Sequence, residues 1–380
     1  MMAAKISPRF LINEIRGSVC FVQRRHRVKT KWAGSRPKVP ATDLALQHFD
    51  ATYGLQLGDL WPSVRIGMLS EKKYGALLNN FASDSDIVSS FHSQGCRDFI
   101  SAARSTESQD PELHDHTAAP LSSNIQCFVF PRGDVSRFKP ARPDSNGLLS
   151  YYLLDAASVL PALALDVQPG HSVLDLCAGP GGKTLALLQA QAVRFLWAND
   201  LSGSRTARLR RTLQSYLPRE LLTEDRVYIT SSDGRQWRNK DEHKFDKVLV
   251  DVPCTTDRHS LTEEDNNIFK RSRTKERQRL PLLQMELLLA GIQATRPGGD
   301  VLYSTCSLSQ LQNQCVVEQA VSVAQKEMDI TVKVQNLSSF VQLFSHTFHF
   351  APQPAVGELV LPHLCANFGP IYMCKLQRIS

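Results

Sequence analysis

Short apolar runs alternate with amphipathic stretches from residue 171 to the end of the chain. The runs have the length of β-strands, whereas the stretches between them repeat apolar residues at helical spacing. This alternation predicts a Rossmann-like α/β domain, a parallel sheet flanked by helices, at about residues 150–380. The predicted strands are residues 172–177, 194–200, 226–230, 247–253 and 300–307, with a closing pair at 357–362 and 369–376.

The chain ahead of this domain follows a different pattern. Apolar residues at 41–100 have helical spacing, so residues 31–149 are expected to form a mainly helical N-terminal extension. Residues 105–124 are polar with few apolar positions, which indicates a loop or linker inside that extension. Two short elements are expected next, a strand at 127–130 and a helix at 151–167.

The composition narrows the class of protein. With 380 residues, 42% hydrophobic and 21% charged, the chain has the make-up of a soluble globular protein and can bury a core without disulfides. It contains no uncharged apolar run of eighteen residues, which argues against a membrane-spanning protein. Its nine cysteines include no CxxC pair, so we expect free thiols in a reducing compartment and no metal site.

The net charge of +7 is concentrated at the N-terminus. Residues 1–38 contain ten Lys or Arg and one acid, Glu14, whereas the rest of the chain has 34 basic and 36 acidic residues. A basic, acid-poor segment with interleaved apolar residues is typical of a mitochondrial targeting sequence, so residues 1–30 are predicted to direct the chain to the mitochondrial matrix. The alternative is a basic arm that stays on the chain and binds nucleic acid, and both properties can occur together.

A glycine-rich turn, AGPGGKT, follows the first predicted strand of the domain and precedes a helix. Such a turn brings backbone N–H groups close to a ligand. A Walker A loop would need glycine where Cys177 stands, and a dinucleotide GxGxxG would need glycine at Thr184. S-adenosylmethionine is the candidate ligand that remains. Asp200 ends the next predicted strand, where a carboxylate can bind the ribose of the cofactor. Asp233 and Gly234 follow the third predicted strand, where they can meet the edge of the adenine. A tight turn without a ligand is the alternative.

Two cysteines and an acid lie at the ends of the fourth and fifth predicted strands. Asp251 and Cys254 end the fourth strand, and Cys306 ends the fifth. Open parallel sheets place their active sites at the carboxyl ends of strands. A single buried cysteine is more often an inert apolar side chain, but two thiols beside an acid on the same rim favour chemistry.

These motifs, CAGPGGKT, DVPCTT and STCS, resemble in order and spacing the Sun-domain RNA cytosine-5 methyltransferases over about residues 130–380. The segments ALQHFDATY, LGDLWPS, VPCTTDRHSL and NNIFKRSR are similar to the member that acts on mitochondrial ribosomal RNA. Gly179 departs from the family, which usually has Ala or Ser there, but it keeps the position small. The resemblance implies a class I S-adenosylmethionine-dependent methyltransferase.

The family's chemistry assigns roles to individual residues. Cytosine carbon 5 is a poor nucleophile until a thiolate adds to carbon 6, and the resemblance gives that attack to Cys306. It gives contact with ring nitrogen N3 to Asp251 and product release to Cys254. By the same resemblance the cofactor pocket is lined by Gly181, Gly182, Lys183, Asp200, Arg205, Asp233, Gly234 and Asp251.

Basic residues close to these motifs are candidates for RNA contact. The run KRSRTKERQR at 270–279 follows the Cys254 loop, and a second basic group includes Arg205, Arg208, Arg210 and Arg211. A solvated helix face is the alternative for the run. The RNA-contact candidates are Lys270, Arg271, Arg273 and Lys275.

The absence of an RRM signature suggests that substrate choice comes from elsewhere. The family member that this chain resembles forms 5-methylcytosine in mitochondrial small-subunit ribosomal RNA and acts in ribosome assembly. It works with a helical-repeat partner of the mitochondrial terminator-factor family, which implies the same heterodimer here. The competing hypothesis is a non-catalytic RNA-binding factor for the assembly of ribosomal subunits, and a DNA substrate is a third, less favoured option.

Overall fold

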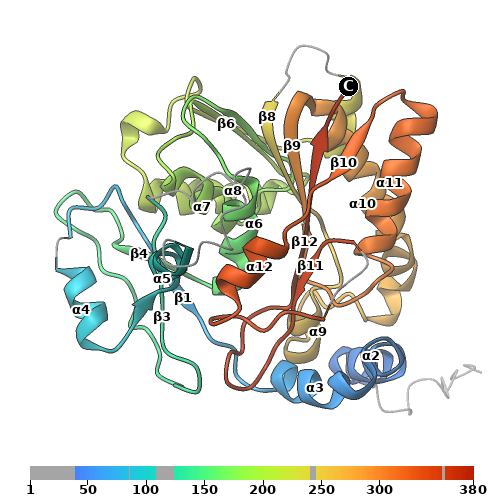
Figure 1. The fold of residues 1–380 in the computed structure, drawn as a ribbon, viewed down its shortest axis with the longest axis horizontal. Helices are drawn as coiled ribbons and strands as arrows, with labels where there is room; N and C mark the ends of the chain where they lie inside the picture. The colour runs from blue at the N-terminus through green and yellow to red at the C-terminus, as the bar shows by residue number, and fades with distance from the viewer. Residues whose placement is uncertain (1–38, 85, 108–123, 240–244, 353–355) are drawn as a thin grey trace, which may run out of the picture. The chain divides into compact units, whose positions relative to one another are not determined.

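The central feature of the computed structural model is an eight-stranded sheet (Figure 1). The structure describes residues 39–380 except 85, 108–123, 240–244 and 353–355, so the predicted targeting segment at 1–30 and most of the predicted linker lie outside the described residues. Its strands are β5 (Ser172–Asp175), β6 (Phe195–Asn199), β7 (Val227–Thr230), β8 (Phe245–Asp251), β9 (Thr295–Thr305), β10 (Val332–Val334), β11 (Glu358–Val360) and β12 (Ile371–Arg378).

The sheet has the order β10-β12-β9-β8-β5-β6-β7, with β11 paired to β12. Strands β9, β8, β5, β6 and β7 run parallel to one another, whereas β12 runs antiparallel to β9. Every strand expected from the alternating pattern is present, including the antiparallel closing pair β11 and β12. Because β5 to β9 are parallel, their carboxyl ends meet at one edge, where the loops that follow them carry Asp200, Asp251, Cys254 and Cys306.

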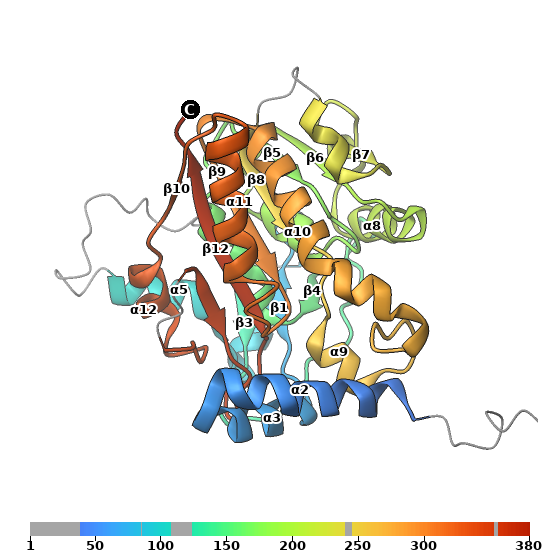
Figure 2. The ribbon, with the colours of Figure 1, turned by 90° about the vertical axis from the view of Figure 1, so that its right-hand side faces the viewer.

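Helices cover both faces of this sheet, as the Rossmann-like pattern predicts. On one face lie α6 (Leu160–Leu165), α7 (Gly182–Gln189) and α8 (Gly203–Tyr216). On the other lie α10 (Thr274–Ala294) and α11 (Gln314–Glu327), which stand in front of the sheet in Figure 2. Two apolar clusters fill the space between the layers, and all four residues of β5 are buried, as expected for a strand covered on both faces.

The N-terminal extension begins with the expected helices, α2 (Ala41–Leu57), η3 (Gly58–Leu60) and α3 (Trp61–Leu69). It continues into a second, four-stranded antiparallel sheet of order β2-β3-β1-β4 that the apolar spacing did not predict. Its elements are β1 (Gly75–Leu78), α4 (Ile87–Ser93), β2 (Arg97–Asp98), α5 (Phe99–Glu107), β3 (Cys127–Val129) and β4 (Tyr151–Leu154). The short strand expected at 127–130 is confirmed as β3, whereas β4 comes from beyond the expected start of the Rossmann-like domain at 150.

The helix expected at 151–167 is wrong in its first part. Residues Tyr151–Leu154 pair with all of β1, and a 3-10 turn, η5 (Ala156–Val159), precedes α6. Asp155 separates strand from helix because its side chain accepts the Ala157 N–H at 3.0 Å and thereby caps η5. A short apolar run fits the repeat of a strand as well as that of a helix, and here pairing with β1 makes it a strand.

The remaining short helices lie in the loops. They are η6 (Arg219–Leu221), η7 (Gly234–Asn239), α9 (Asp257–Thr262), η8 (Arg271–Arg273) and α12 (Ser338–Phe344). Within the described ranges, every helix is too short or too polar to span a bilayer, and no group of His, Cys, Asp or Glu is placed to hold a metal ion. The cysteines of the described part are free thiols, as expected.

The close approach of α10 to the sheet yields a stability prediction. A Cβ on Gly291 would lie 2.5 Å from Val250 Cγ2, whereas one on Gly203 of α8 meets nothing within 4 Å. We expect Gly291→Val to lower the free energy of unfolding by about 1–3 kcal/mol through overpacking, and Gly203→Val to change it little. Urea unfolding of both variants checks this, and equal stabilities would contradict the packing described.

Candidate active site

The glycine-rich turn joins β5 to α7 at the carboxyl edge of the sheet. Gly181 caps α7 with φ +113°, a conformation that side chains other than glycine rarely adopt. A Cβ on Gly179 would lie 2.7 Å from both Arg205 Cβ and Asp200 Oδ2, so the family's alanine or serine would require these neighbours to shift. The turn is therefore packed against the segment that carries Asp200.

A pocket of about 180 Å³ opens beside this turn. The pocket brings together residues from the small sheet, β5, α7 and β8. It is lined by Tyr152, Leu154, Ser158, Asp175, Cys177, Ala178, Gly179, Pro180, Gly182, Lys183 and Asp251. The sequence-predicted residues Gly182, Lys183 and Asp251 thus line one pocket, and their contact with the cofactor stays a prediction.

Asp175, the last residue of β5, lines the same pocket and was not singled out from the sequence. It is 1% exposed, and its Oδ2 accepts a hydrogen bond from Thr184 Oγ1 at 2.6 Å. Its buried Oδ1 has no hydrogen-bond partner among the described residues. Burial raises the pKa of Asp175 to about 7. An acid inside an apolar strand was the available signal, and an unpaired carboxylate oxygen suits a cationic ligand.

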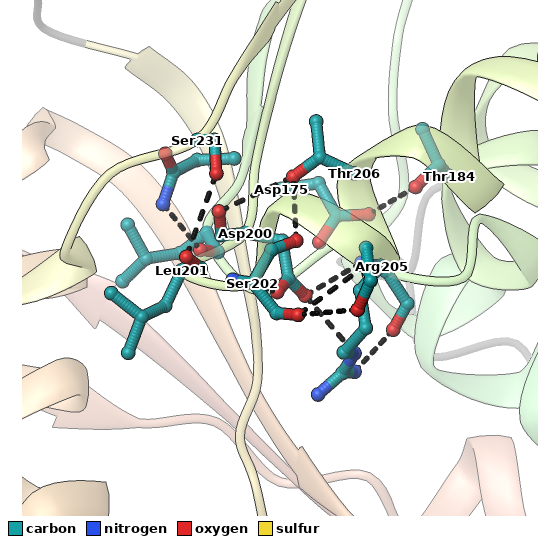
Figure 3. Close-up of polar contacts among 12 residues, drawn as sticks. Asp175, Thr184, Asp200, Leu201, Ser202, Arg205, Thr206 and Ser231 are labelled. Atoms are coloured by element: carbon teal, nitrogen blue, oxygen red, sulfur yellow. Dashed lines mark hydrogen bonds and ion pairs between the residues drawn. The ribbon is translucent and has the colours of Figure 1, made fainter.

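Asp200 follows β6, as predicted, and is tied to the glycine turn (Figure 3). Its Oδ2 accepts the Gly179 N–H at 3.0 Å, and its Oδ1 accepts the Ser202 N–H at 2.9 Å. Arg205 Nε lies 3.4 Å from Asp200 Oδ2, and the same guanidinium donates to the Gly179 carbonyl. Asp200 and Arg205 therefore stand together at the outer side of the turn.

Asp233 and Gly234 follow β7 but do not line the pocket beside Lys183. The Asp233 carboxylate accepts hydrogen bonds from the guanidinium of Arg235, which lowers the pKa of Asp233. Arg235 also pairs with Glu286 of α10 at 3.0 Å. The role of Asp233 and Gly234 at an adenine edge stays a prediction.

Lys183 and Asp251 form an ion pair at the inner end of the pocket. Lys183 Nζ lies 2.9 Å from Asp251 Oδ2, and Ser304 Oγ donates to Asp251 Oδ1 at 2.7 Å. Burial works against the charge of Lys183, but the Asp251 carboxylate outweighs it, and the pKa of Lys183 is raised. Ser304 belongs to the motif STCS, yet nothing in that motif indicates its contact with Asp251.

The two predicted cysteines meet beside this ion pair. Cys254 Sγ and Cys306 Sγ are 3.2 Å apart, although the residues are separated by 52 positions in the chain. The hydrogen bond with Cys254 and burial raise the pKa of Cys306 well above its usual value, and the nearby Lys183 acts in the opposite direction. The site therefore holds a mostly protonated thiol next to a second thiol and a carboxylate.

The predicted RNA-contact residues differ in their availability. Arg273 pairs with Glu276 at 2.6 Å and donates to the Asn266 carbonyl, so it has local partners. Arg271 and Lys275 are exposed, and Lys270 is half-buried. Contact with RNA stays a prediction for all four.

The pocket fits S-adenosylmethionine on its own chemistry. The cofactor is a cation with an amino-acid end and no phosphate, and the pocket combines backbone groups of the glycine turn with the unpaired oxygen of Asp175 and the ammonium of Lys183. Lys183 would bind the carboxylate of the cofactor, and Asp175 would bind one of its positively charged groups. The doubly wound sheet and this pocket define a Rossmann-like, S-adenosylmethionine-dependent methyltransferase.

Comparison with known proteins defines the family. A sequence model described as 16S rRNA methyltransferase RsmB/F matches residues 162–361. The chain is 54% identical to the 5-cytosine rRNA methyltransferase NSUN4 of Xenopus tropicalis over 98% of both chains, and 56% identical to that of Mus musculus over 94% of both. It is 38% identical to the mitochondrial tRNA (cytosine(34)-C(5))-methyltransferase of Danio rerio over 91% of this chain and 90% of the relative.

Solved structures agree on the fold. A methyltransferase homolog from Pyrococcus horikoshii is similar with a TM-score of 0.59 at 21% identity, covering 90% of this chain and 99% of the other. NSun6 from Pyrococcus horikoshii is similar with a TM-score of 0.57 at 16% identity, covering 90% of this chain and 98% of the other. The chain belongs to the RsmB/F, or Sun-domain, family and is an RNA cytosine-5 methyltransferase.

The raised pKa of Asp175 predicts how stability depends on pH. An acid whose pKa is about 7 when folded and near 4 when unfolded binds its proton more tightly in the folded state. Its contribution to stability is therefore present below pH 4 and is lost as the pH rises to 7. We expect the free energy of unfolding of Asp175→Asn to fall less between pH 5 and pH 8 than that of the unsubstituted protein. Urea unfolding at both pH values measures this, and identical pH dependence would contradict the assignment.

Proposed function

We propose that this chain forms 5-methylcytosine in mitochondrial small-subunit ribosomal RNA through a covalent adduct with Cys306. The observation that carries the proposal is the pair of thiols 3.2 Å apart beside the Lys183–Asp251 ion pair. One thiol suffices to activate the cytosine ring. The second thiol, Cys254, within contact distance of the first, therefore supports a separate role in releasing the product. The names of the rRNA-methylating relatives at 54–56% identity support ribosomal RNA as the substrate class.

The proposed chemistry uses residues of the described site. The Cys306 thiol gives up its proton as its sulfur adds to carbon 6 of the cytosine, and the displaced electron pair makes carbon 5 nucleophilic. Asp251 passes that proton to ring nitrogen N3, so that no negative charge is left on the adduct, and Lys183 and Ser304 hold the two oxygens of its carboxyl group. S-adenosylmethionine supplies the electrophilic methyl group when bound.

Product release needs two bond changes after carbon 5 is methylated. Carbon 5 loses its proton to a base, and the electron pair re-forms the ring double bond and expels the Cys306 sulfur, to which the proton on N3 returns. Cys254 contacts the Cys306 sulfur and is thus placed to assist this expulsion. Carbon 5 then carries the methyl group, and both thiols return to their starting state.

The cellular setting rests on the sequence. The basic, acid-poor N-terminal segment supports import into the mitochondrial matrix, and the word mitochondrial in the name of the 38% identical relative agrees with it. The near-neutral body supports a partner that supplies RNA binding, proposed to be a helical-repeat protein of the terminator-factor family. A role in the assembly of ribosomal subunits belongs to the same proposal, and a purely non-catalytic assembly factor is the alternative.

Covalent trapping distinguishes these alternatives. In the presence of S-adenosylmethionine and mitochondrial ribosomal RNA, with and without the partner, we expect Cys254→Ala to accumulate a protein–RNA band that survives denaturation. The band forms because attack by Cys306 proceeds while release is impaired. Denaturing electrophoresis measures it, and the double variant with Cys306→Ala is the control without a band. Absence of the band in every combination, with cofactor binding intact, would favour the assembly factor.

The raised pKa of Cys306 gives a second prediction. Since the thiolate is the reactive form, the single-turnover methylation rate should increase between pH 7 and pH 9, by up to about tenfold per unit while the pH stays below the thiol pKa. Rapid-quench kinetics with saturating cofactor measure the rate. Calorimetric binding of the cofactor over the same range is the control, and a flat or falling rate would contradict a protonated resting thiol.

A further inference from the structure

Asp257, the first residue of α9, is a fully buried acid that the proposed chemistry does not use. Both of its carboxylate oxygens are occupied. Oδ2 accepts the Leu308 N–H at 2.7 Å and the Tyr53 hydroxyl at 2.7 Å. Oδ1 accepts the hydroxyl of Thr255, and Ser307 Oγ lies 3.2 Å from both oxygens. Burying a carboxylate is unfavourable unless it is hydrogen-bonded in this way, so the arrangement has a structural purpose.

These contacts connect the two cysteine loops to each other. Thr255 is adjacent to Cys254, whereas Ser307 is adjacent to Cys306. The backbone N–H of Asp257 also donates to the Cys306 carbonyl at 3.2 Å. The Asp257 side chain therefore contacts Thr255 and Ser307, the residues next to the two cysteines. The Asp257 backbone also holds the backbone of Cys306.

The loop that carries Cys254 contains a strained backbone. Thr256 has φ +45°, in the left-handed region that β-branched residues rarely adopt. In that conformation the Thr256 N–H points to Cys254 Sγ at 3.4 Å. Such a conformation persists only when neighbouring contacts fix it, and Thr255 and Asp257 are the residues on either side.

Tyr53 extends the network to the N-terminal helix α2. Its hydroxyl donates to Asp257, and its ring stacks on Phe49 with centroids 4.9 Å apart and meets the edge of Trp61 at 5.6 Å. The side chain is 3% exposed. The extension thus contributes a rigid group to the rear of the cysteine loops.

We propose that Asp257 is a positioning residue that keeps Cys254 within reach of Cys306, with Tyr53 holding its carboxylate in place. Cys306 directly follows the long strand β9, and Thr305 Oγ1 donates to Asn313 Oδ1 at 2.6 Å. Cys254 lies beyond the end of β8 at Asp251, in a loop that Gln312 also contacts at the Thr255 N–H. Loss of the Asp257 carboxylate therefore displaces Cys254 more than Cys306. The catalytic consequence, which rests on the proposed function, is slower release of the adduct with attack largely retained.

A test without RNA measures the position of the thiols. Diamide oxidises two adjacent thiols to a disulfide and is itself reduced to the hydrazine, so the rate at which Cys254 and Cys306 cross-link reports their proximity. We expect Asp257→Asn to slow this reaction by about tenfold, the effect of losing one charged hydrogen bond, and Tyr53→Phe to slow it less. Mass spectrometry of the cross-linked peptides measures the rate. Asp265→Asn, at an exposed acid near α9, is the matched control and should react like the unsubstituted protein.

A second test follows the adduct with RNA. In rapid-quench experiments with S-adenosylmethionine and mitochondrial ribosomal RNA, Asp257→Asn and Tyr53→Phe should prolong the lifetime of the covalent band while its rate of formation changes little. Tyr53→Phe keeps a folded core and decides the outcome if Asp257→Asn fails to fold. Cross-linking and adduct decay at the unsubstituted rates in both variants would overturn the proposal. If neither the unsubstituted protein nor Cys254→Ala forms an adduct, the proposed function is wrong. The rates of cross-linking by diamide then still test whether Asp257 positions the two thiols.

Discussion

The ion pair between Lys183 and Asp251 is the interaction on which the site depends. It connects the first turn of α7, which borders the cofactor pocket, with the end of β8, which leads to Cys254. The Lys183 side chain is largely buried and that of Asp251 is partly buried, so removal of Asp251 would leave the Lys183 charge without its partner, a costly state away from solvent.

Around this pair, the thiols are positioned by contacts that reach across the whole chain. Parallel strands β8 and β9 place Cys254 and Cys306 at adjacent strand ends. The strands alone determine the positions of residues in the following loops only approximately. Behind these loops lie buried polar groups, among them Asp257, which Tyr53 of α2 contacts, and we propose that they set the final separation of 3.2 Å. The N-terminal extension therefore contacts the residues behind the cysteine loops.

The sequence predicted the central sheet well because each of its strands is a separate apolar run between helices. It also predicted that Asp251, Cys254, Cys306, Lys183 and Asp200 lie at one edge, since order along a doubly wound sheet determines which strand ends are neighbours. It did not predict β1 and β4, whose short runs gain strand structure only by pairing with each other. Nor did it identify Asp175 or Asp257, because their importance lies in burial and in hydrogen bonds between segments far apart in the chain.

Analysis of the modified nucleoside tests the central claim most directly. The protein is incubated with S-adenosylmethionine labelled in its methyl group and with mitochondrial small-subunit ribosomal RNA, and the RNA is then digested and its nucleosides are separated by mass spectrometry. The account predicts label in 5-methylcytidine with the unsubstituted protein and none with Cys306→Ala. Label in another nucleoside, or 5-methylcytidine formed equally well without the Cys306 thiol, would contradict it.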